Sequence, residues 1–316
     1  MTYTRRPVDT MCPFRLRLLS FLIGYLFLVP AAYAQVEGLP PREASPLFIR
    51  QIHSGHSLTD TYMSHPWPGR LILATQATPG GGNAYDRIAK STIPGSPLHW
   101  RWTHAPGYGD PDARSDIGNF ELLVTTEGSP LSPDTEELGA TTLEHIEKWV
   151  RNTWEHGNGG RGAELMLYST WVHWRSPEEE STGAEDRLPF RRYLEVEGRK
   201  WEQMQDHANA IRPTGMPPVY MIPGHRLLMR VYDDIEAGRA PGLDHISDVF
   251  SDDIHLNDLG QYAITCLVYT VIYQLDPREL PDKLADPEDT LSQEQARYFK
   301  KIVWEVATEY DRAGMQ

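Results

Sequence analysis

The chain has 316 residues and carries 30 Lys and Arg against 44 Asp and Glu, which gives a formal net charge of −14 at pH 7. A protein this acidic is a poor match to nucleic acid and to anionic lipid, so we expect neither as a partner. The length is enough for one large domain with a substantial core.

Residues 1–34 are typical of a secretory signal peptide. Four arginines precede an apolar run over residues 18–29, and Ala32-Tyr33-Ala34 offers a small-x-small cleavage site before Gln35. The apolar run is shorter than the roughly 20 residues that a membrane span needs. We therefore expect cleavage after Ala34 and a secreted or periplasmic protein with no membrane span after removal of the signal.

Residues 35–316 are predicted to be a single domain, because no repeat and no Pro/Gly/Ser linker divides them. Of the two cysteines, Cys12 lies in the predicted signal and Cys266 in an apolar stretch. The mature chain then has no disulfide to form, and its core alone must hold it together.

Short apolar segments alternate with helical patterns along this domain. Near-continuous apolar runs are typical of strands that are buried on both faces of a parallel sheet. The alternation predicts a three-layer αβα fold with right-handed crossovers. The predicted strands cover residues 47–52, 120–125, 165–168 and 219–222, and the predicted helices between them cover 142–154, 190–211 and 225–237.

Two further helices are predicted near the C-terminus. Residues 258–275 are apolar nearly all round and stop before a proline, which indicates a buried helix. Ser292 and Gln295 form a capping-box pattern ahead of an apolar stripe, which predicts a helix on the flank of the sheet. Residues 80–118 lack such periodicity and are interpreted as an active-site loop region, and the polar insertion 175–189 is expected to be a surface loop.

Gly55-His56-Ser57 stands where the first predicted strand ends. Ligands of an open parallel sheet bind at the carboxyl ends of its strands. Glycine lets the backbone turn tightly, and a serine in such a bend can direct its own N–H toward an oxyanion. Ser57 is therefore a candidate nucleophile.

Asp252-Asp253-Ile254-His255 offers the base that a serine nucleophile needs. A catalytic base must itself be oriented by an acceptor. Asp252 lies three positions before His255 and can reach one ring nitrogen, which leaves the other nitrogen for Ser57. Taken alone, the loop is equally compatible with an aspartate that caps a turn beside a surface histidine.

The two motifs together resemble those of the SGNH (GDSL-like) hydrolases. The resemblance implies a flavodoxin-like sheet of about five parallel strands, with Ser57 as nucleophile, His255 as general base and Asp252 as its orienting partner. The reaction that it implies requires no cofactor. The matching residues are Gly55, Ser57 and Asp60 in the first block, and Asp252, His255, Leu256, Asn257 and Gly260 in the last.

The middle of the chain departs from the family pattern. Members usually supply a further oxyanion donor from an asparagine after the third strand, whereas Glu127-Gly128-Ser129 stands there in this chain. A carboxylate repels a developing oxyanion unless it is protonated or turned away. Either Glu127 has another task, such as binding a substrate hydroxyl, or the donors come from elsewhere. Gly82 and Asn83 are the candidates, unless their glycine-rich run is a plain loop turn.

Two other groups of residues could bind ligands. His53 and His56 form an H-x-x-H pair, but no glutamate-bearing helix surrounds it, so no metal is expected. Four tryptophans near the predicted loop face could stack on sugars, although tryptophan more often packs in a core or loop. These are Trp100, Trp102, Trp171 and Trp174.

These features predict an exported serine esterase that hydrolyses acyl esters, with O-acetyl groups on a carbohydrate as the favoured substrate. An O-acetyltransferase that uses the same three residues would differ only in excluding water. A non-catalytic glycan-binding protein of the same fold is the third alternative. The missing asparagine favours it, and the joint presence of Ser57, Asp252 and His255 opposes it.

Overall fold

Five parallel strands form one sheet in the order β2-β1-β3-β4-β5. The computed structural model describes residues 38–60, 67–107, 109–131, 138–175, 189–284 and 291–315. The predicted signal peptide and residues 176–188 of the polar insertion lie outside these ranges. The strands are β1 (Gln51–Gly55), β2 (Ile88–Thr92), β3 (Leu122–Thr125), β4 (Glu164–Ser169) and β5 (Tyr220–Pro223).

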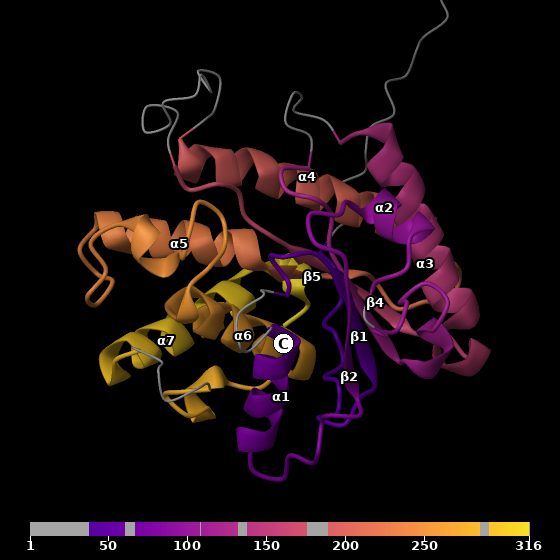
Figure 1. The fold of residues 1–316 in the computed structure, drawn as a ribbon, viewed down its shortest axis with the longest axis horizontal. Coiled ribbons are helices and arrows are strands. Elements are labelled where there is room, and N and C mark those ends of the chain that lie inside the picture. The colour runs from indigo at the N-terminus through magenta and orange to yellow at the C-terminus, as the bar shows by residue number, and fades with distance from the viewer. Residues whose placement is uncertain are drawn as a thin grey trace, which may run out of the picture. The chain divides into compact units, whose positions relative to one another are not determined.

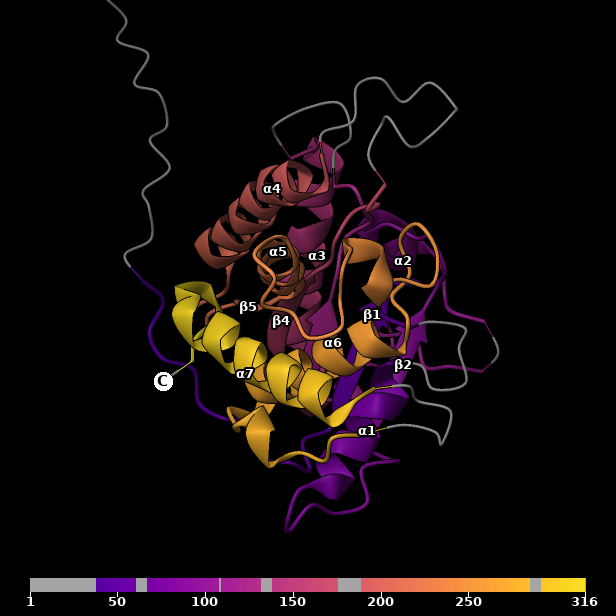
Figure 2. The ribbon, with the colours of Figure 1, turned by 90° about the vertical axis from the view of Figure 1, so that its left-hand side faces the viewer.

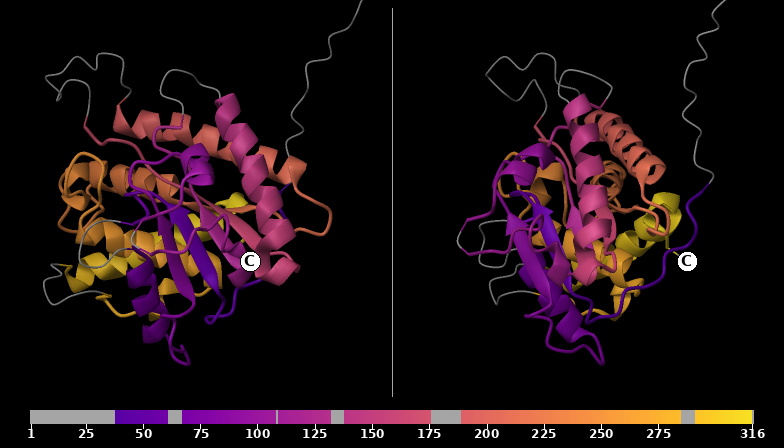
Figure 3. Two further views of the ribbon diagram at one scale, coloured as in Figure 1. Left: turned by 45° about the vertical axis from the view of Figure 1, so that its right-hand side comes forward. Right: turned by 90° about the vertical axis from the view of Figure 1, so that its right-hand side faces the viewer.

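Helices cover both faces of this sheet (Figures 1 and 3). One face is covered by α1, α5, α6 and α7, and the other by α2, α3 and most of α4. The predicted three-layer α/β fold is thereby confirmed. The helices are α1 (Trp67–Ala77), α2 (Leu98–Thr103), α3 (Ala140–Gly160), α4 (Phe190–Ile211), α5 (Gly224–Glu236), α6 (Asp258–Tyr273) and α7 (Gln293–Glu309).

Alternate side chains of each strand enter two separate cores, as the two-residue period of a strand requires. In β4, Met166 and Tyr168 join the core under α6, while Leu165 and Leu167 join the core under α3. Both sets are apolar because both faces are covered. This is why the strand appears in the sequence as a continuous apolar run.

Helix α6 is the buried helix that its composition predicts. Every residue from Gly260 to Tyr273 is buried, since α6 packs between the sheet and α7 (Figure 2). Helix α7 begins with the predicted capping box: Ser292 Oγ accepts from the Gln295 N–H at 3.1 Å, and Gln295 Oε1 accepts from the Ser292 N–H at 3.0 Å. Within the described ranges, no helix is both long and apolar enough to pass through a bilayer.

The first strand starts and ends later than predicted, and one strand and two helices were not predicted at all. β1 excludes Phe48, which is 63% exposed, and instead includes the buried polar residues His53 and Ser54. β2 is an edge strand with a half-exposed Lys90 at its centre. Residues 80–118 were therefore wrongly interpreted as loop alone, because β2 and α2 both lie within them.

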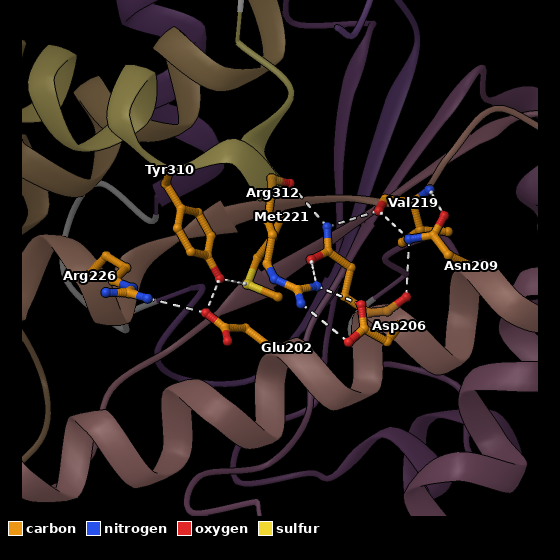
Figure 4. A network of polar contacts seen from close by, with 9 residues as sticks. Glu202, Asp206, Asn209, Val219, Met221, Arg226, Tyr310 and Arg312 are labelled. Carbon is orange, nitrogen blue, oxygen red and sulfur yellow. Dashed lines mark hydrogen bonds and ion pairs between the residues drawn. The ribbon is translucent and has the colours of Figure 1, made fainter. Parts of the chain in front are cut away.

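A side chain of α4 pairs with the backbone just before the other edge strand, β5. The Asn209 amide accepts from the Val219 N–H at 2.9 Å and donates to the Val219 carbonyl at 3.0 Å, as a further strand would do (Figure 4). Arg312 forms an ion pair with Asp206 at 2.7 Å and so holds the C-terminal segment on the same helix. Both backbone polar groups of Val219 are therefore paired at this edge of the sheet.

Candidate active site

A tight turn follows β1 and carries Ser57. The N–H groups of Thr59 and Asp60 both donate to the His56 carbonyl, at 2.9 and 3.0 Å. Thr59 Oγ1 accepts from the His56 N–H at 3.0 Å. Because the turn follows β1, Ser57 lies at the carboxyl edge of the sheet, where parallel sheets bind ligands. β1 lies between β2 and β3, so this turn is not at the side of the sheet.

The turn requires glycine at position 55. A Cβ there would lie 1.8 Å from Thr59 Oγ1, the atom that closes the turn. Thr59 cannot move away without losing its hydrogen bonds to His56. The first residue of the family-like block therefore has a packing role in this chain.

Replacing Gly55 with alanine is expected to displace the Ser57 turn. The overlap should lower the free energy of unfolding by about 1–3 kcal/mol and reduce the expected ester hydrolysis by more than that loss of folded protein explains. Urea unfolding and turnover per folded molecule measure the two effects. Gly82→Ala is the control, because a Cβ at position 82 meets nothing within 4 Å. Equal turnover in Gly55→Ala and Gly82→Ala would contradict the proposed role of the turn.

His56 is fixed as a neutral ring beside Ser57. Its Nε2–H donates to the Glu127 carbonyl at 2.8 Å, and its Nδ1 accepts from the Leu58 N–H at 3.3 Å. Burial, aided by the nearby Arg101 charge, lowers the pKa of His56 to about 3. The ring therefore links the turn after β1 to the segment after β3 and does not act as a base at neutral pH.

Residues 252–255 bring an aspartate and a histidine to the same edge of the sheet. Nε2 of His255 lies 2.8 Å from Ser57 Oγ, and its Nδ1 lies 2.7 Å from Asp252 Oδ2. The second carboxylate oxygen of Asp252 accepts from the N–H groups of Ile254 and His255, at 2.9 and 2.7 Å. Partial burial acts to raise the pKa of Asp252, but these hydrogen bonds and the imidazole hold it below the ordinary value. Asp252 is thus an ionised acceptor.

The start of α6 anchors this loop. Asn257 caps the helix: its Oδ1 accepts from the N–H groups of Leu259 and Gly260, and its Nδ2 donates to the Asp248 carbonyl at 2.8 Å. Gly260 lets the helix approach the preceding segment, because a Cβ there would lie 2.6 Å from the Val249 carbonyl oxygen. These contacts give a physical reason for Asn257 and Gly260 in the motif that begins at Asp252.

Glu127 lies at the site edge with its carboxylate turned toward backbone donors. Oε1 accepts from the N–H groups of Leu98 and Gly128, both at 2.7 Å. The side chain is only 3% exposed, and the buried Arg101 next to it donates to the Thr126 carbonyl and to Ser54 Oγ. In this arrangement Glu127 organises the start of α2, so its predicted contact with a substrate hydroxyl stays a prediction.

The prediction that Gly82 and Asn83 donate to an oxyanion is wrong. Both residues line a pocket with Leu47, Phe48 and Arg50. These neighbours precede β1, so the pocket lies at the amino edge of the sheet, opposite to Ser57. The Asn83 side chain instead accepts from the Tyr85 N–H at 3.1 Å. The sequence did not reveal this, because β2 was not predicted: it begins after the glycine run and is parallel to β1, which places the run at the amino edge.

The four tryptophans have different environments. Trp171 is buried, Trp174 is half-buried, and Trp102 packs edge-on against Trp149 with ring centroids 5.3 Å apart. Trp100 is 45% exposed and stacks on His104. Of the four, Trp100 offers the most exposed ring for a sugar.

The site is suited to chemistry by side chains alone. Within the described part of the chain, no three His, Cys, Asp or Glu side chains gather as a metal site would require. His53 of the H-x-x-H pair instead contacts Gln51 Oε1 at 2.9 Å. A serine, a histidine and an ionised aspartate in one hydrogen-bonded chain can activate the serine hydroxyl as a nucleophile.

Comparisons with known proteins find similarity in fold only. No protein-family model and no curated protein matches the chain. A DUF4886 family protein from Bacteroides uniformis shares 15% identity, with a TM-score of 0.52 over 83% of this chain and 95% of that one. A proposed GDSL-like lipase from Parabacteroides merdae shares 12% identity, with a TM-score of 0.44 over 74% of this chain and 99% of that one.

Proposed function

We propose that the protein is a serine esterase of the SGNH type, with Ser57 as nucleophile, His255 as general base and Asp252 as the group that orients it. One observation carries the proposal: Asp252, His255 and Ser57 form a continuous hydrogen-bonded chain, with contacts of 2.7 and 2.8 Å. A serine nucleophile needs a histidine base beside it and a carboxylate that orients the histidine, which is the order of these three residues.

The reaction proceeds in two steps. Ser57 Oγ attacks the ester carbonyl carbon while His255 Nε2 takes the hydroxyl proton, and Asp252 stabilises the imidazolium that forms. His255 then returns the proton to the leaving alcohol, which leaves an acyl group on Ser57. Water, deprotonated by the same nitrogen, then attacks the acyl carbon. The bond from that carbon to Ser57 Oγ breaks, His255 returns the proton to Oγ, and the acid leaves. The Ser57 N–H, in the turn after β1, is a candidate donor to the developing oxyanion.

The favoured substrate is an O-acetylated carbohydrate outside the cytoplasm. The signal-like residues 1–34 support export. The exposed Trp100, on the helix that follows β2, supports a sugar ligand, because aromatic rings stack on the apolar faces of sugars.

Hydrolysis of p-nitrophenyl acetate by the purified protein tests the proposal. Ser57→Ala and His255→Ala should each lower kcat by about 10⁴-fold or more, with the folded structure retained by circular dichroism. A panel of acetylated glycans, with and without an acceptor sugar, then separates hydrolysis from acetyl transfer. If the parent protein releases acetate from none of these compounds, the esterase proposal fails.

A further inference from the structure

The segment that follows β4 lies along the loop that carries the proposed base. The Trp174 N–H donates to the Asp253 carbonyl at 3.0 Å, and its indole Nε1–H donates to the Asp252 carbonyl at 2.8 Å. The indole Nε1–H of Trp171 donates to the Ile254 carbonyl at 2.6 Å. Three successive carbonyls, from Asp252 to Ile254, are therefore each held by an N–H of this segment.

The two indole rings are themselves held in place. Trp171 is 2% exposed, and its own carbonyl accepts a hydrogen bond from Ser129 Oγ, in the segment after β3. Trp174 packs edge-on against His245 with ring centroids 5.4 Å apart, and the Arg175 guanidinium lies 5.5 Å from the centre of the same ring. The indole N–H groups are thus directed at the loop by packing that does not involve the triad.

Burial alone cannot fix the proposed acid–base pair. The Asp252 side chain is 55% exposed and the His255 side chain 32%. An exposed carboxylate–imidazole contact gains little from Coulomb attraction in water. The loop backbone must therefore be held from outside for the two side chains to keep their alignment with Ser57.

We infer that Trp171 and Trp174 are positioning residues of the proposed active site, and that their indole N–H groups set the orientation of the Asp252–His255 loop against Ser57. The inference rests on the proposed function. Both indole N–H groups donate to backbone carbonyls of the loop, at Ile254 and Asp252, so the two residues act through the loop. Their loss should slow the chemical step while leaving substrate binding almost unchanged, because a misplacement of about 1 Å costs about 10²-fold in rate.

Trp174→Phe is the most direct test, because phenylalanine keeps a ring against His245 but lacks the N–H donor. We expect kcat for p-nitrophenyl acetate to fall about 10- to 100-fold, with KM unchanged within about twofold. A two-ring analogue at position 174 with sulfur in place of the indole N–H should give the same loss. Trp304→Phe, which makes the same change at a half-buried tryptophan on α7, should keep the parent kcat.

A second measurement does not depend on the substrate. The imidazole N–H between His255 and Asp252 should give a low-field proton resonance that disappears in His255→Ala. We expect Trp174→Phe to shift or broaden it, and Trp304→Phe to leave it unchanged. If the parent protein shows no ester turnover, the proposed function is overturned. If Trp174→Phe leaves both the resonance and kcat unchanged, the positioning role is overturned. A fall in kcat that matches a fall in folded protein would also overturn that role.

Discussion

Replacing Asp252 with asparagine is expected to lower kcat for ester hydrolysis by about 10³- to 10⁴-fold without unfolding the protein. The asparagine oxygen can still accept from the N–H groups of Ile254 and His255, as Asp252 Oδ1 does. Its NH₂ group, however, would face His255 Nδ1 and donate to it. The histidine proton must then sit on Nε2 and point at Ser57, so the ring can no longer accept the serine proton.

Asp253→Asn is the matched control for this variant. It removes the same charge from the adjacent position, where the side chain forms a partly exposed ion pair with Arg175 at 2.8 Å. Such surface pairs contribute little to stability, so turnover should stay near the parent value. Equal losses in Asp252→Asn and Asp253→Asn would mean that loop charge, and not the Asp252–His255 hydrogen bond, sustains the reaction.

Acidification is expected to unfold the protein between about pH 6 and pH 4, because three buried histidines stay neutral in the fold. Burial lowers the pKa of His53, His56 and His225 to about 3 from the ordinary 6.5. Between these values the unfolded chain binds protons that the folded chain does not, so stability rises with pH and falls on acidification. Each histidine then costs about 1.4 kcal/mol per pH unit below 6.5, or about 6 kcal/mol for the three together at pH 5.

This loss is comparable to the whole stability of a typical domain, about 5–15 kcal/mol. The raised pKa of Asp60, caused by burial, has the opposite sign and offsets part of it. Urea unfolding at a series of pH values measures the slope. His225→Phe should reduce the slope between pH 6 and pH 4, whereas a change at the exposed His104, such as His104→Gln, should leave it unchanged. A free energy of unfolding that is flat from pH 7 to pH 5 would contradict the buried-histidine account.

The layered fold could be predicted because its inner elements are apolar on every side. β4 and α6 are buried on nearly every side, so each appears in the sequence as a continuous apolar run. The length of the run then distinguishes the strand from the helix. β2 could not be predicted in the same way, since its five residues form neither an apolar run nor a regular alternation and include a lysine. Helix α1 follows residues 61–66, which the structure does not describe, and its sequence contains a Pro-Gly pair that does not suggest a helix.

The proposed site could be predicted only where spacing along one segment decided the geometry. Asp252 reaches His255 because three positions separate them on one loop, and Ser57 stands at a strand end. Gly82 and Asn83 were assigned to the wrong edge because the missed helix α1 returns the chain to the amino edge before β2 runs parallel to β1. The roles of Trp171 and Trp174 depend on indole N–H groups that meet a loop about 80 positions away in sequence, which no local pattern encodes.

The proposed nucleophile and its base come from distant parts of the chain. Ser57 follows the first strand, and His255, 198 positions later, precedes the helix that packs against the finished sheet. During synthesis the serine emerges early and remains an ordinary hydroxyl until most of the chain has followed it. Because α6 needs the completed sheet for its burial, the base arrives only when long-range packing is complete. An incomplete or partly folded chain therefore carries no activated serine, and the proposed esterase activity would be a signal that folding has finished.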